Sequence, residues 1–83
     1  MAYSITYKQS VERDLRRIDR SRLKRLVGVL ESKLSEDPHI GKALSGEFEG
    51  LYRIRIGDYR VVYSIMSKTV LVLRIAHRKD VYR

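Results

Sequence analysis

The fold is decided by the stretch LYRIRIGDYRVVYSI, which occupies residues 51–65. Strand-forming apolar residues alternate with basic ones around Gly57-Asp58, a dipeptide typical of two-residue turns, so the stretch predicts a β-hairpin. This turn pairs Arg55 with Arg60. Because side chains alternate across a strand, one face of the hairpin is expected to be apolar and the other basic. The apolar face holds Tyr52, Ile54, Ile56, Tyr59, Val61 and Tyr63, and the basic face holds Arg53, Arg55 and Arg60.

Like charges directly opposite each other destabilise a strand pair, so Arg55 facing Arg60 is a local cost. A bound phosphate backbone would offset this cost. The alternative is a solvated face whose arginines spread apart into water. A face that served only solubility would be expected to mix both signs of charge, which favours the polyanion.

The excess positive charge is concentrated in the last part of the chain. Residues 50–83 carry eight Lys or Arg against two acids, a net charge of +6, whereas residues 1–49 carry ten against eight, a net charge of +2. A basic sheet interleaved with tyrosines is typical of proteins that bind nucleic acid.

Composition limits the remaining choices. A chain of 83 residues forms one small domain, 1–83, with a single core. The chain has no Cys, which excludes disulfides and thiolate chemistry. No apolar run approaches the ~18 residues that span a bilayer, so we expect a cytoplasmic protein without membrane contact. We also expect no metal and no cofactor, because the chain clusters no ligands at the spacings of metal motifs.

Hydrophobic periodicity predicts a strand over 2–7, two helices, and then three strands. The first helix follows Ser10 as its cap, and a break at 19–21 precedes a second helix that Asp37-Pro38 ends. Gly28 lies inside this second helix, and we expect close packing as its reason. The helical arginines are expected to form a solvated face, because acids accompany them.

After the helices, residues 39–50 predict a loop anchored by Leu44 and Phe48, and residues 69–76 predict a strand buried on both faces. The expected fold is therefore α+β: an N-terminal strand, an antiparallel two-helix hairpin and a three-stranded antiparallel meander.

Signatures of conventional enzymes are absent from the sequence: it has no phosphate-binding glycine loop and no nucleophile elbow. Chemistry would have to come from Arg, Lys, Tyr and His. These groups suit RNA transesterification, in which the substrate's own 2′-hydroxyl attacks the adjacent phosphate. Catalysis then reduces to positioning, charge neutralisation and the transfer of two protons.

An ordered set of segments resembles the RelE-type toxins of toxin–antitoxin systems. The set consists of 44–50, the hairpin 52–63 and the closing segment 77–82. The resemblance covers essentially the whole chain. It implies a ribosome-dependent endoribonuclease that cuts messenger RNA in the ribosomal A site and is held inactive by a cognate acidic antitoxin.

The resemblance also assigns residues. The family's basic pair falls on Arg53 and Arg55, its transition-state arginines on Arg60 and Arg78, and its C-terminal tyrosine on Tyr82, which would stack on or orient the nucleotide. Further RNA contacts are expected from Arg74, Lys79 and Arg83. Arg74 has an alternative role in a buried ion pair, and Tyr82 has one in packing against the sheet.

One departure from the family affects the mechanism. Well-studied members have lysines in the basic pair, whereas this chain has two arginines, and arginine is a poor base because its pKa exceeds ~12. His77 is a candidate acid/base group, with a structural role as the alternative.

Two other functions stay open. ParE-like toxins share the fold and inhibit DNA gyrase, although they typically lack the full basic set with the terminal tyrosine. A catalytically decayed module that binds nucleic acid or antitoxin is the other, and fold alone does not separate the three.

Overall fold

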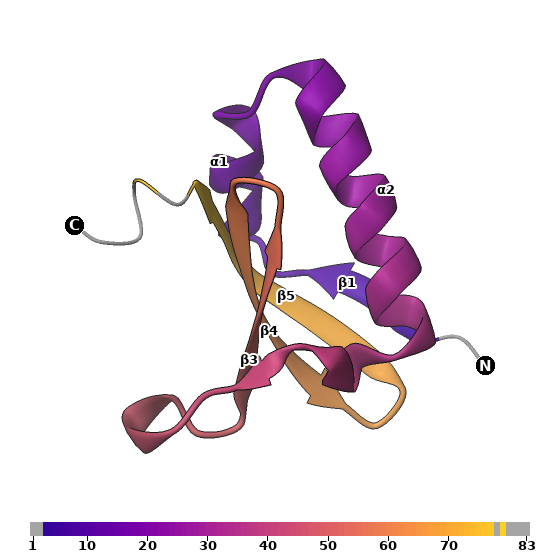
Figure 1. Ribbon diagram of the computed structural model, residues 1–83, viewed down its shortest axis with the longest axis vertical. Coiled ribbons are helices and arrows are strands. Elements are labelled where there is room, and N and C mark those ends of the chain that lie inside the picture. The colour runs from indigo at the N-terminus through magenta and orange to yellow at the C-terminus, as the bar shows by residue number, and fades with distance from the viewer. Residues whose placement is uncertain (1–2, 78, 80–83) are drawn as a thin grey trace.

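The computed structural model describes residues 3–77 and residue 79. Five strands form one sheet in the order β1-β5-β4-β3-β2, with β1 parallel to β5 and the other neighbours antiparallel (Figure 1). The α-helices and strands are β1 (Ser4–Tyr7), α1 (Val11–Arg16), α2 (Arg20–Glu36), β2 (Lys42–Ala43), β3 (Leu51–Ile56), β4 (Tyr59–Met66) and β5 (Thr69–His77), and two short 3₁₀-helices span Pro38–Ile40 and Gly46–Phe48. The α+β fold expected from the sequence is confirmed, including the antiparallel meander of β3, β4 and β5.

The β3–β4 hairpin has the register that its turn predicts. Ile56 pairs with Tyr59, Arg55 with Arg60 and Ile54 with Val61. Gly57 has a φ of +61°, the left-handed value that a two-residue hairpin turn requires at its first central position. Because this turn fixes the register, it also fixes which face of the sheet each side chain of the hairpin occupies.

Both ends of helix α2 lie at residues that can be recognised in the sequence. The Asp19 carboxylate accepts hydrogen bonds from the Ser21 hydroxyl at 2.5 Å and from the backbone N–H of Arg22 at 3.4 Å, and these contacts lower the Asp19 pKa. The helix ends at Glu36, before Pro38. Ser10 is the N-cap residue of α1, as expected, but its hydroxyl makes no capping hydrogen bond there.

The core lies between α2 and one face of the sheet. Its largest buried side chain is Tyr63, whose hydroxyl donates a 2.6 Å hydrogen bond to the Pro38 carbonyl oxygen. Burial raises the Tyr63 pKa to about 12, and the ring stacks on Tyr52 with centroids 5.6 Å apart. The buried apolar residues are Val11, Ile18, Leu26, Leu30, Leu34, Val61, Tyr63, Val70, Val72 and Ile75.

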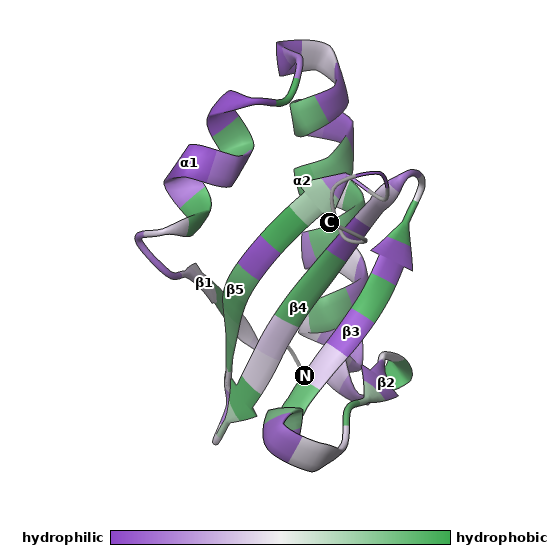
Figure 2. Cartoon of the chain, turned by 90° about the vertical axis from the view of Figure 1, so that its left-hand side faces the viewer, coloured by the Kyte–Doolittle hydropathy of each residue, from purple (hydrophilic) through white to green (hydrophobic). Residues whose placement is uncertain are grey.

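Among the residues that the structure describes, no helix lies over the other face of the sheet. Figure 2 looks onto this face: α2 lies behind the sheet and α1 lies beside β5. We therefore find that β5 is buried on one side only, with Val70 and Val72 buried and Leu71 and Leu73 partly exposed. The expected burial of this strand on both faces is wrong because α2 covers only one face of the sheet.

Three further expectations are corrected. Gly28 is exposed, and a Cβ added there would meet nothing within 4 Å, so close packing is not its reason. Phe48 is 53% exposed and does not anchor its loop. That loop also contributes the short strand β2, which pairs Lys42 with Arg53.

Candidate nucleic-acid interface

The uncovered face of the sheet carries arginines from three neighbouring strands. Arg55 of β3 lies opposite Arg60 of β4, and Arg53 and Arg74 flank Val62 two residues further along. Lys42 of β2 extends the second row beyond Arg53. Side chains directly opposite each other have Cβ atoms about 5 Å apart, so these cations lie at spacings that a phosphate backbone can bridge.

No acidic residue interrupts these rows. The sequences of the five described strands contain neither Asp nor Glu. Arg55 is exposed, while Arg53, Arg60 and Val62 are partly buried. The strands of this face therefore combine a partly apolar floor with charges of one sign, as expected from the hairpin. Lys42 was not expected there, because a strand of two residues has no periodicity to detect.

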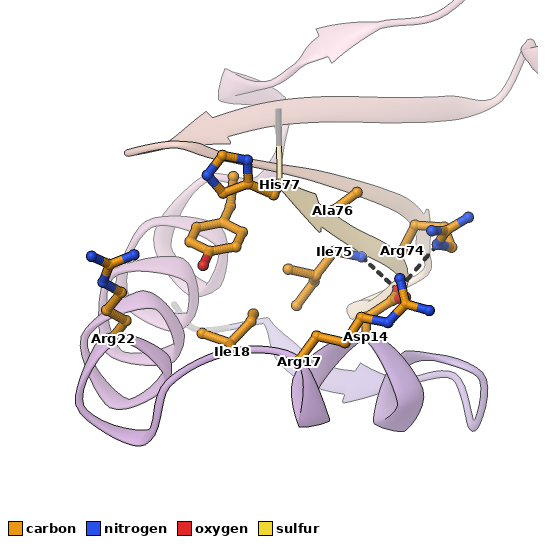
Figure 3. Close-up of a pocket in the computed structure, with 9 residues that line it drawn as sticks. Asp14, Arg17, Ile18, Arg22, Arg74, Ile75, Ala76 and His77 are labelled. Atoms are coloured by element: carbon orange, nitrogen blue, oxygen red, sulfur yellow. Dashed lines mark hydrogen bonds and ion pairs between the residues drawn. The ribbon is translucent and has the colours of Figure 1, made fainter. Parts of the chain in front are cut away.

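Arg74 forms an exposed ion pair with an acid from α1. Its Nε lies 3.1 Å from Oδ2 of Asp14, and the same oxygen accepts a 3.0 Å hydrogen bond from the backbone N–H of Ile75 (Figure 3). The Asp14 side chain is 13% exposed and that of Arg74 is 60% exposed. The sequence left two roles open for Arg74, an RNA contact and a buried ion pair. Neither describes the arrangement completely, because Arg74 is paired and yet remains accessible to a ligand.

The position of Asp14 follows from the unequal lengths of two strands. β1 pairs with β5 only as far as Val72, while β5 continues to His77. The outer edge of β5 would then present unpaired backbone N–H groups, which are costly when buried. The Asp14 carboxylate supplies an acceptor at this edge, so α1 takes the place of a longer β1 there.

His77 lies on the helix-covered side of the sheet. It pairs with Tyr59, and the two rings meet edge to face with centroids 5.3 Å apart. Its Nδ1 accepts a 3.2 Å hydrogen bond from the backbone N–H of Lys79, which assigns the proton of the neutral ring to Nε2. Arg60 pairs with Ala76, the preceding residue, so the Arg60 and His77 side chains leave opposite faces. This geometry disfavours proton transfer by His77 at a phosphate bound to Arg60.

The space beside His77 is a pocket of about 300 Å³ between the helices and the end of the sheet, and Figure 3 shows its lining. Arg17 and Arg22 approach it from the helical side, and Asp14 with Arg74 closes one end. Arg74 therefore belongs both to the lining of this pocket and to the arginine face.

Several expected site residues lie outside the described residues, namely Arg78, Tyr82 and Arg83. Lys79 is described and exposed. Within 3–77 and 79, no three His, Asp or Glu side chains gather in a way that could hold a metal ion. No helix in that part of the chain has the length and hydropathy to cross a membrane.

Comparison with known proteins identifies the family. Residues 5–82 match the family model described as ParE toxin of type II toxin–antitoxin system, parDE. Toxin RelG of Mycobacterium tuberculosis is 35% identical over 86 aligned positions, covering 100% of this chain and 99% of that protein. The chain is a RelE-type toxin of the RelE/ParE superfamily. Toxin RelE of the same organism is 36% identical, covering 98% of this toxin and 87% of that one.

Solved structures agree with this assignment of the toxin. The toxin–antitoxin complex RelBE2 from M. tuberculosis contains a chain that matches with a TM-score of 0.87 and 32% identity, covering 94% of this toxin and 100% of that chain. The archaeal RelE–RelB complex from Pyrococcus horikoshii matches with a TM-score of 0.72 and 26% identity, covering 94% and 97%. A mutant of Escherichia coli toxin RelE in the free state shares the fold at 22% identity and a TM-score of 0.74, covering 99% and 92%.

Proposed function

We propose that this toxin is a ribosome-dependent endoribonuclease that cuts messenger RNA in the ribosomal A site. The observation that supports this most directly is the row of arginines on a sheet face whose strands contain no acid. Arg55 facing Arg60 costs stability in the free protein, and an RNA phosphate between them offsets that cost. Arginine also matches phosphate geometry, because its planar fork donates two parallel hydrogen bonds.

The proposed reaction needs no nucleophile from the protein. The 2′-oxygen of the RNA forms a bond to the adjacent phosphorus, the bond from phosphorus to the 5′-oxygen breaks, and a 2′,3′-cyclic phosphate and a 5′-hydroxyl result. One proton leaves the 2′-hydroxyl and one joins the departing 5′-oxygen, so the protons balance. Arg53, Arg55 and Arg60 would hold the phosphate and stabilise the charge that develops on it.

The remaining roles rest on the resemblance to the family. Arg78 would add a second transition-state cation, and Tyr82 would stack on or orient the nucleotide. Lys79, Arg74 and Arg83 would contact the flanking backbone. Arginines remain charged at neutral pH and are poor bases. We therefore propose that the ribosome positions the message in line for attack, and that free RNA is cut poorly or not at all.

The cognate partner would be an acidic antitoxin. The RelBE2 structure and the RelBE structure from E. coli are toxin–antitoxin complexes. A chain with a net charge of +8 is expected to bind a partner that brings carboxylates to its arginines, because complementary charge speeds association and selects the partner.

Inhibition of DNA gyrase is the second candidate function, because the matching family model is described as ParE toxin. Two assays on one purified preparation separate the candidates. Primer extension on a message under translation is expected to reveal cleavage at A-site codons that disappears when ribosomes are omitted. Gyrase supercoiling is expected to proceed at the uninhibited rate. Inhibited supercoiling with an intact message would reject the nuclease and favour the gyrase inhibitor.

A further inference from the structure

The pocket beside His77 combines aromatic rings with aliphatic side chains. Tyr59 and His77 line it, and their rings meet edge to face with centroids 5.3 Å apart. Ile18 and Ile75 add aliphatic surface. The volume of about 300 Å³ lies at the lower end of the ~300–1,000 Å³ that is typical of ligand pockets, so the pocket suits a small ligand. The rings favour a ligand with a flat, aromatic part.

The helical side of this pocket carries positive charge. Arg17 follows the end of α1 and Arg22 lies in the first turn of α2, and Figure 3 shows both at the pocket. Arg17 forms no ion pair with another described residue. Arg22 contacts Asp19, whose carboxylate accepts the Arg22 backbone N–H, but Asp19 does not line the pocket. The two guanidinium groups are therefore placed to bind a phosphate, because their planar forks match its oxygens.

The acid of the pocket is already engaged, and His77 keeps a donor. Of the described residues that line the pocket, Asp14 is the one acid, and its Oδ2 accepts hydrogen bonds from Arg74 Nε and from the Ile75 N–H. The Nδ1 of His77 accepts the Lys79 N–H, so the ring proton lies on Nε2, which donates to no other described residue. The pocket therefore offers uncompensated positive charge together with a ring N–H that can meet the polar edge of a base.

The rim of the pocket belongs to the arginine face. Ala76 of β5 pairs with Arg60 of β4, and Arg74 lies two residues before Ala76 on the same strand. Both Ala76 and Arg74 also line the pocket. Neighbouring strands lie about 4.8 Å apart, so the rim lies beside a phosphate that is bound to Arg60. An RNA strand on the arginine face can therefore place a neighbouring nucleotide in this pocket.

The groove between α2 and the tip of the β3–β4 hairpin, two elements that Figure 1 labels, has a different lining. It has a volume of about 530 Å³ and shares Arg22 and Tyr59 with the pocket. Its floor is aliphatic and consists of Leu26, Val29 and Ile56. Bases of single-stranded nucleic acid stack on aromatic side chains, and only the pocket adds His77 as a second ring. A nucleotide therefore fits the pocket better than the groove.

We propose that the pocket beside His77 is a subsite for one nucleotide that flanks the scissile phosphate. The base lies against Tyr59 and His77, and the phosphate of this nucleotide binds Arg17 and Arg22. The proposal rests on the proposed function, because it assigns a further part of the same RNA. The same chemistry suits a free nucleoside monophosphate, so the experiment has to separate these two sources.

Binding is measured first, without the ribosome. Each ribonucleoside 5′-monophosphate is titrated into the isotope-labelled full chain, with inorganic phosphate as the comparison, and the backbone amide signals are followed by NMR. Arg17→Ala and Arg22→Ala each remove one cation of the pocket. Arg13→Ala and Arg25→Ala are the matched controls, because these arginines are equally exposed and do not line the pocket.

A second pair of variants tests the ring of His77. His77→Asn removes the imidazole but keeps a side-chain acceptor near the Lys79 N–H, so the turn after β5 is preserved. His39→Asn is the control, because His39 is exposed and lies outside the pocket. The dispersion of the amide signals reports whether each variant is folded.

We expect Arg17→Ala and Arg22→Ala to weaken the binding of nucleoside monophosphates by ~10-fold or more, as loss of a hydrogen bond to a charged group does. His77→Asn should weaken it by ~5-fold or more, the lower end of the effect of losing a stacking partner. The control variants should bind as the wild type does. Inorganic phosphate should bind more weakly than the nucleotides, because it lacks the base.

Cleavage of a translated message separates RNA from a free nucleotide. Arg22→Ala and His77→Asn should raise the KM for message and change kcat little, because they remove binding away from the reacting atoms. An added nucleoside monophosphate should raise the apparent KM of the wild type by competing for the pocket. It should have little effect on Arg22→Ala.

Three results would overturn the subsite. Inorganic phosphate that binds as tightly as the nucleotides would leave an anion site that does not recognise a base. Equal losses in the pocket variants and in Arg13→Ala and Arg25→Ala would make the binding diffuse. Loss of nucleotide binding with an unchanged KM for message would assign the pocket to a free nucleotide. A wild type that binds nucleotides in the pocket and cuts no message would instead reject the proposed function.

Discussion

Two cationic surfaces of this toxin differ in what lies between their charges. On the sheet, arginines from adjacent strands lie beside Val62 and Ala76 on an uncovered face whose strands contain no acid. Beside α2, cations border a concave floor of Leu26, Val29 and Ile56, with Asp58 among them. Net charge attracts a polyanion or an acidic peptide equally well. The surface between the cations, by contrast, is open on the sheet and concave beside α2.

The largest expected effect is on the arginine face. Arg60→Ala should lower the rate of A-site cleavage by ~100-fold or more, because it removes an electrostatic contact made to the transition state. Primer extension on translated message measures this rate.

The same variant should stay folded, because Arg60 lies directly opposite Arg55 and its replacement removes one of two like charges that face each other. Full toxicity with unchanged cleavage would remove the arginine face from the proposed active site.

The next largest effect is expected for Asp14, whose carboxylate contacts β5. Asp14→Ala should lower the free energy of unfolding by about 1.5–3 kcal/mol, because the Ile75 N–H and Arg74 both lose their charged acceptor. Urea denaturation followed by circular dichroism measures the change.

Glu12→Ala is the matched control. Glu12 is exposed and lies 3.9 Å from Arg16, so its loss should change stability by less than ~1 kcal/mol. Equal decreases in the free energy of unfolding of the two variants would mean that the Asp14 carboxylate does not stabilise the outer edge of β5.

A smaller effect is expected on the salt dependence of RNA affinity, which should distinguish the arginines of the sheet face from an exposed arginine of α1. Arg55→Ala should reduce the log–log dependence of ribosome or RNA affinity on salt by ~0.7 for each single-strand phosphate contact removed. Arg16→Ala, on α1, should leave this slope unchanged because that side chain is 79% exposed and lies outside both surfaces. Equal reductions would show that binding is diffuse over the whole cationic surface.

The smallest effect tests the solvent side of α2. Gly28→Ala should raise the free energy of unfolding by up to ~1 kcal/mol, because alanine favours the helix and the added Cβ meets nothing within 4 Å. Cleavage should not change, since Gly28 lies on α2 and outside the arginine face. A destabilised variant in thermal unfolding would indicate a packing role after all.

The sequence alone was sufficient for features that depend on neighbours along the chain. The Gly57-Asp58 turn and strict alternation determined the register of the hairpin, and with it the shared face of Arg53, Arg55 and Arg60. The Pro38 stop and the spacing of Leu26, Leu30 and Leu34 determined where α2 ends and which side it buries. These signals are short in range, because a turn or a helical turn involves only a few consecutive residues.

Only the tertiary structure decided which distant residues meet. Asp14 and Arg74 lie 60 residues apart, and their contact exists because β1 is shorter than β5 and α1 fills the remaining edge. The open face of β5, the placement of His77 away from Arg60, and the groove shared by α2 and Arg55 also follow from how the helices dock on the sheet. The helices dock on the sheet because docking buries apolar surface, and this driving force has no preferred direction. No local pattern of residues therefore predicts how the helices dock.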